Sequence, residues 1–178
     1  PPISVDERLR RIAKAQKLMQ EKGIDALYLD CSSSMTYFTG LKYRRTERMH
    51  SAVLPAKGDI VHVSPAFEVE KLKTMLLFDG KINVWEEDED PTAVVTETIK
   101  SLGYPRGTVA VDEATPFFTF DGLRKAGNSY TFVNGNDVTA ACRMIKSDQE
   151  IALMQTAKNI TLEAHKAAAR ILREGITT

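Results

Sequence analysis

The stretch that decides how this chain is organised is Arg143-Met-Ile-Lys-Ser-Asp-Gln-Glu-Ile-Ala-Leu-Met-Gln-Thr-Ala157. Ser147 and Glu150 form a capping box, and Asp148 adds a negative charge to the first turn of the helix that this pattern predicts. Neither glycine nor proline interrupts the chain again before Gly175, so we expect one long helix within residues 147–178.

Apolar residues cover more than one side of this expected helix. The first stripe comprises Met154, Ala157, Ala164, Ala168 and Ile171, and a second set widens it, namely Ile151, Leu153, Ile160, Ala167 and Leu172. A helix that is apolar over so much of its girth needs cover on several sides. We therefore expect a globular domain over residues 1–146, a linker helix over 147–178, and a protein longer than this chain.

Composition is that of an ordinary globular domain. Of its 178 residues 43% are apolar, and 24 acidic side chains balance 24 basic ones. The zero net charge argues against a nucleic-acid-binding protein. No apolar run has the length of a membrane span, and the first seven residues lack the layout of a signal peptide. We expect a soluble, cytoplasmic protein with no nucleic-acid or membrane partner.

The chain before residue 147 alternates between helical and strand patterns. Helices are expected at 5–22, 35–38, 65–76, 91–102, 116–126 and 136–142, and strands at 24–30, 49–54, 60–63, 82–85, 109–111 and 130–133. Residues 55–59 should close a hairpin between the second and third strands. This order predicts an α/β fold with a mixed, mostly parallel sheet of five to six strands and helices on both faces.

Residues that carry chemistry are few and scattered. The three histidines, His50, His62 and His165, form no metal-binding motif, and there is neither a phosphate-binding glycine loop nor a nucleophile elbow. Cys31 and Cys142 sit in apolar surroundings and are expected to be reduced thiols. The sequence therefore predicts no catalytic residue and no metal ligand in this chain.

Three motifs resemble those of a known family. The run Arg143-Met-Ile-Lys-Ser147 with Glu150-Ile151 resembles the junction between the N-terminal and catalytic domains of creatinase, prolidase (Xaa-Pro dipeptidase) and aminopeptidase P. Gly175-Ile-Thr177 is similar to the step that opens the catalytic domain in that family, and Tyr37-Phe-Thr-Gly40 is similar to its Tyr-x-Thr-Gly loop. The resemblance extends over the whole chain but over only half of a family protein.

This resemblance implies the N-terminal, non-catalytic domain of a metal-dependent Xaa-Pro peptidase. Family members hydrolyse peptides with two divalent ions, manganese, cobalt or zinc, which are bound by a C-terminal domain; none of those ligands has a counterpart here. The resemblance further implies a homodimer formed through this domain, proline-containing peptide substrates, a parent enzyme that is a hydrolase, and a fragment that is inactive alone. Two rivals stay open: the N-terminal domain of a creatinase-like amidinohydrolase, and a protein-binding module of a member that has lost its metal site.

Within the loop that follows Gly40, the resemblance assigns substrate contact to Arg48 and Tyr43. Arg48 aligns with a position that in creatinase binds a substrate carboxylate across the dimer, and a guanidinium fork suits that task. Tyr43 would add a wall or a hydroxyl group. The alternative is a solvated basic loop of Lys42, Arg44, Arg45 and Arg48 in which Glu47 pairs locally. Trp85 is either a neighbour of the partner's substrate site or an ordinary core aromatic.

Overall fold

The computed structural model describes residues 2–177, and they form two compact units. The sheet unit comprises residues 4–144, and the helix unit comprises residues 145–177 together with residues 2–3. Among the helices of this described part, none combines the length and apolarity that crossing a bilayer requires.

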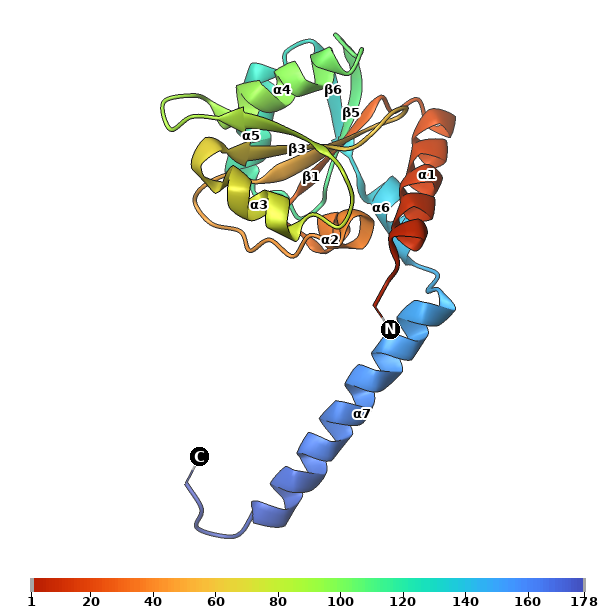
Figure 1. Ribbon diagram of the computed structural model, residues 1–178, viewed down its shortest axis with the longest axis vertical. Helices are drawn as coiled ribbons and strands as arrows, with labels where there is room; N and C mark the ends of the chain where they lie inside the picture. Colours follow the sequence, from red (N-terminus) through yellow and green to blue (C-terminus); the bar gives the residue numbers. More distant parts are fainter. Residues whose placement is uncertain (1, 178) are drawn as a thin grey trace. The chain divides into compact units, whose positions relative to one another are not determined.

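Helices and strands alternate in the sheet unit as its sequence predicts (Figure 1). The six strands are β1 (Ala26–Asp30), β2 (Ser51–Pro55), β3 (Val61–Pro65), β4 (Lys81–Trp85), β5 (Gly107–Val111) and β6 (Tyr130–Asn134). The helices are α1 (Val5–Glu21), α2 (Ser33–Thr39), the short 3-10 helix η1 (Ala66–Glu68), α3 (Val69–Met75), α4 (Pro91–Ser101), α5 (Phe117–Ala126) and α6 (Asn136–Arg143).

The strands form one mixed sheet in the order β4-β3-β2-β1-β5-β6. Strand β2 pairs antiparallel with both of its neighbours, β1 and β3, whereas the pairs β3–β4, β1–β5 and β5–β6 are parallel. Five strands therefore point the same way and β2 alone is reversed. The predicted hairpin between β2 and β3 is confirmed, and so is the mixed, mostly parallel sheet.

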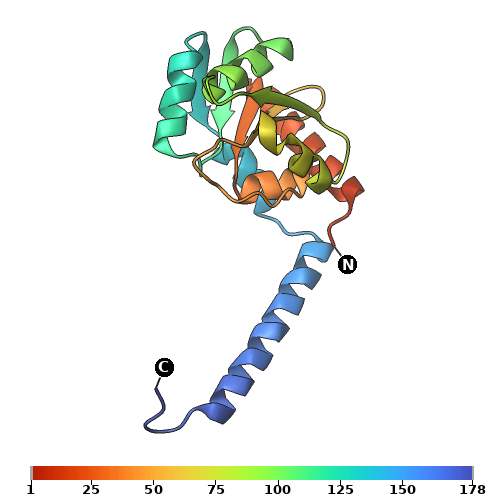
Figure 2. The same cartoon turned by 60° about the vertical axis from the view of Figure 1, so that its left-hand side comes forward.

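Two hydrophobic cores lie on opposite faces of the sheet because successive strand residues point to opposite sides. On β1, Leu27 and Leu29 belong to the core that α1, α2, α3 and α6 cover, while Ala26 and Tyr28 belong to the core under α4 and α5. Figure 2 separates these two layers, with α4 and α5 on one side of the strands and α1, α2 and α3 on the other. The expectation of helices on both faces is confirmed.

Local sequence signals set most helix boundaries. The hydroxyl of Ser4 caps α1 and the carboxylate of Asp90 caps α4, and each accepts a bond from a backbone N–H of the first turn. Gly40 ends α2 in the left-handed conformation, at φ 79°. Two helix starts carry no such cap: α5 begins after Pro116 without a side-chain cap, and the helix expected over 65–76 begins as η1 before it continues as α3.

The helix unit consists mainly of α7 (Asp148–Ile171), a helix of 24 residues. Both bonds of the capping box are present, since the Ser147 hydroxyl accepts from the Glu150 N–H and the Glu150 carboxylate accepts from the Ser147 N–H. Taken by itself, α7 has no buried residue, and large apolar side chains such as Met154, Ile160 and Ile171 are exposed along it. The long helix expected from the opening stretch is confirmed.

Candidate functional site

The direction of the strands brings polar side chains together at one edge of the sheet, which we call the rim. Because β1, β3, β4, β5 and β6 run the same way, their carboxyl ends share this edge, the usual place for binding sites in open α/β sheets. The chain between α2 and β2, residues 40–50, forms neither helix nor strand there. We call it the rim segment. It contains both residues that the sequence nominates, Tyr43 and Arg48.

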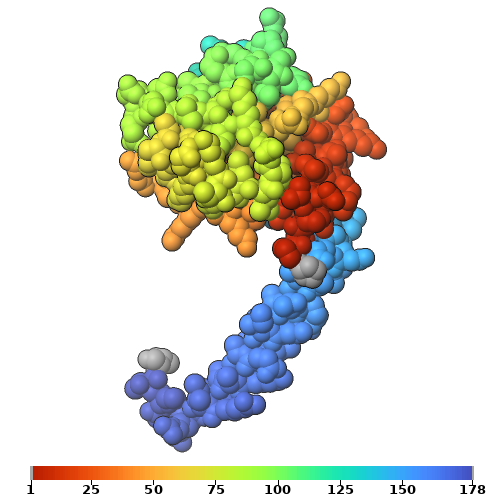
Figure 3. All heavy atoms as spheres, viewed as in Figure 1, coloured from red at the N-terminus to blue at the C-terminus, as the bar shows by residue number. Residues whose placement is uncertain are grey.

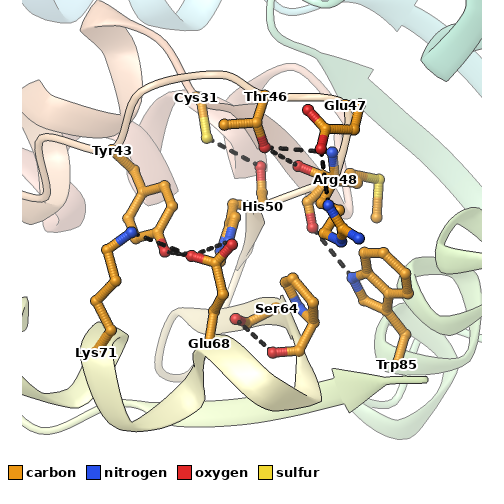
Figure 4. A network of polar contacts seen from close by, with 12 residues as sticks. Cys31, Tyr43, Thr46, Glu47, Arg48, His50, Ser64, Glu68, Lys71 and Trp85 are labelled. Atoms are coloured by element: carbon orange, nitrogen blue, oxygen red, sulfur yellow. Dashed lines mark hydrogen bonds and ion pairs between the residues drawn. The ribbon is translucent and has the colours of Figure 1, made fainter. Parts of the chain in front are cut away.

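Tyr43 holds the first part of the rim segment against η1 and α3. Its hydroxyl donates a hydrogen bond to the carboxylate of Glu68, and its ring lies 3.9 Å from the ring of His50, centroid to centroid (Figure 4). Lys71 pairs with the same carboxylate at 3.2 Å and lies 4.8 Å from the centre of the Tyr43 ring. The hydroxyl is therefore already bonded, and the partly buried ring is the part of Tyr43 that can form a wall.

Charge in this group is set by burial and by the Tyr43 hydrogen bond. That bond is the main reason why the pKa of Glu68 is lowered, so its carboxylate is ionised at neutral pH. Burial lowers the pKa of His50 to about 4, although the Glu68 carboxylate 3.5 Å from its Nε2 acts in the opposite direction. His50 is therefore neutral at physiological pH, and neither of its ring nitrogens has a hydrogen-bond partner among the described residues.

Arg45 fixes the middle of the rim segment to the ends of β1 and β5. Its Nε donates to the Asp30 carboxylate at 2.9 Å, and a terminal nitrogen donates to the Ala114 carbonyl at 2.6 Å. Asp30 ends β1, and Asp112, which accepts a hydrogen bond from the Ser32 hydroxyl, directly follows β5. Burial raises the pKa of both carboxyl groups, and hydrogen bonds from Arg45 and Ser32 oppose that effect.

Arg48 lies two residues before the end of the rim segment, and its side chain is partly exposed. Its Nε and one terminal nitrogen donate to the two oxygens of Glu87 at 2.8 and 3.3 Å, and the other terminal nitrogen donates to Glu47 at 2.7 Å. The guanidinium carbon lies 5.1 Å from the centre of the exposed Phe67 ring. The local pairing with Glu47 that the solvated-loop interpretation expects is present. The hydrogen bond that Arg48 donates to Glu87 is the main reason why the pKa of Arg48 is raised.

Trp85 and the cysteines have structural environments. Trp85 is buried in the core under α4 and α5, and its indole N–H donates to the Met49 carbonyl at 3.1 Å. Burial raises the pKa of the half-buried Cys31 thiol to about 12, so no reactive thiolate forms there at neutral pH. Cys142 is buried, and both thiols are free. By contrast, Phe117 and Phe118, the first two residues of α5, are exposed.

Within residues 2–177, no three side chains of His, Cys, Asp or Glu are grouped so that they could hold a metal ion. The donor set therefore does not fit a two-metal hydrolytic centre. A shallow groove of about 560 Å³ lies between α3 and the start of β4, where Leu76, Phe78 and Ile82 line it. It is at the amino end of β4 and contains no residue of the rim segment. In Figure 3 the golden and lime atoms of this part of the chain lie on the front of the sheet unit.

Reasoning from the sequence located the rim segment but missed the residues that hold it. Glu68, Asp30 and Asp112 carry no motif, because each acts through a partner distant in sequence. One signal was available: Asp30 and Asp112 each stand at the end of an apolar strand. Had β1 and β5 been known to be parallel neighbours, that position would have placed both carboxylates on the rim.

Comparisons with known proteins agree with this architecture. Residues 11–145 match the family model described as the creatinase/prolidase N-terminal domain. An uncharacterized peptidase from Staphylococcus epidermidis is 24% identical over 168 residues, which cover 94% of this chain and 46% of the relative. The chain thus spans about half the length of the curated relatives it matches.

Solved structures show the same fold. The recombinant prolidase from Thermococcus sibiricus superposes with a TM-score of 0.85 at 23% identity, covering 98% of this chain and 46% of that protein. The N-terminal domain of the Xaa-Pro dipeptidase from Lactobacillus brevis matches with a TM-score of 0.66 at 19% identity, covering 76% of this chain and 99% of that one. With the family model spanning most of the sheet unit, this chain belongs to the creatinase/prolidase N-terminal domain family.

Proposed function

We propose that this chain is the non-catalytic N-terminal domain of a metal-dependent Xaa-Pro peptidase, in which it pairs subunits and walls the substrate site. The observation that carries the proposal is the fold match with a prolidase over 98% of this chain but only 46% of the other protein. In this proposal, catalysis belongs to a C-terminal domain that begins after α7.

The distribution of polar groups supports this division of labour. The described residues offer no metal-binding group, and the buried His50 is neutral at physiological pH, next to an ionised Glu68 that already bonds to Tyr43. Two divalent ions, manganese, cobalt or zinc, would be bound by the C-terminal domain, where they would supply activation of water. This chain would supply binding and orientation only.

Apolar surface on α7 supports a further domain beyond the sheet unit. Ile151, Met154 and Ile160 have 55%, 58% and 67% of their surface exposed, and apolar side chains of this size on one helix mark a protein interface. A linker helix packed against a catalytic domain would cover them. The relatives, about twice as long as this chain, provide the length for such a domain.

In the proposed enzyme, Arg48 binds the carboxylate of the peptide substrate and Tyr43 forms part of the wall beside it. The guanidinium of Arg48 lies over the exposed ring of Phe67, and the carboxylates of Glu87 and Glu47 accept hydrogen bonds from its two donor edges. Because these partners are exposed acidic side chains, a ligand carboxylate can take the place of one of them at the guanidinium. Arg45 does not have this role, because its donors hold Asp30 and Ala114.

The proposal is tested with the full-length polypeptide and with this chain alone. The full-length protein, assayed with manganese, cobalt or zinc, is expected to hydrolyse Xaa-Pro dipeptides, and this chain alone is expected to be inactive. Arg48→Ala should raise KM for an Xaa-Pro substrate with a free carboxylate by roughly tenfold or more, the loss of a charge-assisted contact of about 1.5 kcal/mol or more. Unchanged kinetics would refute the role of Arg48.

The same assay separates the rival functions. Hydrolysis of creatine with no action on Xaa-Pro peptides would assign the chain to a creatinase-like amidinohydrolase. A full-length protein without metal affinity or hydrolytic activity would leave a protein-binding module. Pairing through this domain is tested by light scattering of the full-length protein: a dimer is expected, and a monomer at micromolar concentration would contradict it.

A further inference from the structure

The carboxylate-binding edge of Arg48 is already occupied by a side chain of the same protein. Glu87 contacts the Nε and one terminal nitrogen of the guanidinium with both of its oxygens, at 2.8 and 3.3 Å. This two-point geometry is the one in which an arginine grips the carboxylate of a ligand. Glu47 meets the other terminal nitrogen at 2.7 Å, so the opposite edge is used as well.

Glu87 is presented to Arg48 from a short, locally fixed turn. It lies in the turn between β4 and α4, two residues after the buried Trp85, and the carboxylate of Glu89 accepts a hydrogen bond from the Glu86 N–H at 2.8 Å. Arg48 comes from the rim segment, 39 residues earlier. The contact therefore joins two parts of the rim that are distant in sequence, and neither Arg48 nor Glu87 lies in a helix or a strand that its loss would disturb.

The contact is exposed enough to be exchanged. Solvent reaches 58% of the surface of the Glu87 side chain and 36% of that of the Arg48 side chain. Exposed ion pairs contribute little net stability because water and salt compete with them. A ligand carboxylate that arrives with additional contacts elsewhere can therefore displace Glu87 while Phe67 and Glu47 keep the guanidinium in place.

We infer that Glu87 is a built-in competitor for the carboxylate of the substrate, so that it sets how tightly Arg48 binds that group. The inference rests on the proposed function and makes it more specific: the ligand class is a peptide with a free carboxylate, which must replace Glu87 to bind. A substrate whose carboxylate is blocked as an amide cannot replace Glu87 at Arg48. Its affinity should therefore not depend on whether residue 87 carries a charge.

The contact itself is tested in this chain by nuclear magnetic resonance of arginine side chains. Glu87→Gln should shift the Nε–H resonance of Arg48, which Arg48→Lys identifies by removing it. Asp88→Asn is the matched control, because it removes the same charge from the same exposed turn at a residue that forms neither a hydrogen bond nor an ion pair with Arg48. An Arg48 resonance that is the same in Glu87→Gln as in the wild type would overturn the inference.

The competition is tested by kinetics on the full-length polypeptide. Glu87→Gln should lower KM for a carboxylate-ended Xaa-Pro substrate by about two- to fivefold, the range for an exposed ion pair, with kcat unchanged. KM should stay at the wild-type value in Asp88→Asn, and the corresponding amide substrate should not distinguish Glu87→Gln from the wild type.

The outcomes separate this inference from the function on which it rests. If Arg48→Ala raises KM while Glu87→Gln leaves it unchanged, Arg48 binds the carboxylate but Glu87 does not compete. If Glu87→Gln raises KM instead, Glu87 holds Arg48 in position and the inference is wrong. An equal fall of KM in Glu87→Gln and Asp88→Asn would also overturn it, because general charge repulsion would then be the cause. If neither Arg48→Ala nor Glu87→Gln has an effect, the proposed contact and this inference fail together.

Discussion

Replacing His62 by leucine should reduce how strongly the stability of the sheet unit depends on pH. His62 lies on β3 with 1% of its surface exposed, and its Nδ1 has no hydrogen-bond partner in the described part of the chain. Burial, with a smaller contribution from His50, lowers the pKa of His62 from 6.5 to about 4. The imidazole is therefore neutral in the folded protein at pH values where the unfolded chain already takes up a proton.

The sign and size of the effect follow from this difference in pKa. As pH falls from 6.5 toward about 4, the unfolded state binds a proton at His62 and the folded state does not, so stability that is present above pH 6.5 is lost. At pH 5 the loss for this one group is about 2 kcal/mol. His62→Leu removes this loss of stability at low pH, because leucine does not bind a proton. At pH 7 the variant should lie within about 1.5 kcal/mol of the wild type, because leucine fills a similar volume and leaves no unpaired nitrogen.

The assay is urea unfolding at pH 7 and pH 5, followed by the fluorescence of Trp85, the one tryptophan of the chain and a buried residue of the sheet unit. Between the two pH values, the wild type should lose about 2 kcal/mol more than His62→Leu. His165→Gln, a change at an exposed histidine of α7, is the control and should behave as the wild type. If His62→Leu and the wild type lose equal stability between pH 7 and pH 5, the folded protein does not keep His62 neutral and the reasoning is refuted.

Two further changes test how the rim segment is held, both by urea unfolding at neutral pH. Gly40→Ala should lower the free energy of unfolding by about 2–4 kcal/mol, because alanine must adopt a positive φ while its methyl group meets Leu77 and the Arg8 Nε, the latter at 2.8 Å. Gly23→Ala is the control, since residue 23 also has a positive φ but has open space around it. It should lower the free energy of unfolding by only about 1 kcal/mol. Equal losses would show that the close packing at Gly40 carries no penalty. Arg45→Met should cost about 1–3 kcal/mol by leaving the buried Asp30 carboxylate without its ion-pair partner, and Asp30→Asn in the same chain should restore part of that loss. Additive losses would show that the two side chains are not coupled.

The sequence predicted the order of helices and strands because those signals are local. The capping box at Ser147 and Glu150 and the glycine at residue 40 each act within one turn of chain, and both have the predicted conformation. The exposure of Phe117 and Phe118 was not predictable in this way, since it depends on which residues of α5 face the sheet. Tertiary packing decides that, and helical periodicity in a ten-residue helix leaves it ambiguous.

The site was predictable only in part for the same reason. A motif placed Tyr43 and Arg48 on one loop, but the carboxylates that they contact, Glu68 and Glu87, come from positions 25 and 39 residues later. The reversal of β2, which the predicted hairpin at residues 55–59 implies, brings those positions to the same edge of the sheet, but no motif says which side chains meet there. The contacts of Tyr43 with Glu68 and of Arg48 with Glu87 could therefore be found only from the three-dimensional arrangement of the strands.

The rim segment is a part of this domain whose residues can be replaced while the rest of the fold is kept. Its ends are anchored in the core, at the buried Leu41 behind α2 and at the buried His50 ahead of β2, while the residues between them form neither helix nor strand. Natural variation or a designed graft can therefore replace residues 42–48 as a cassette, provided that an arginine remains to neutralise Asp30. Ligand preference can change in this way while the strands and both hydrophobic cores stay the same.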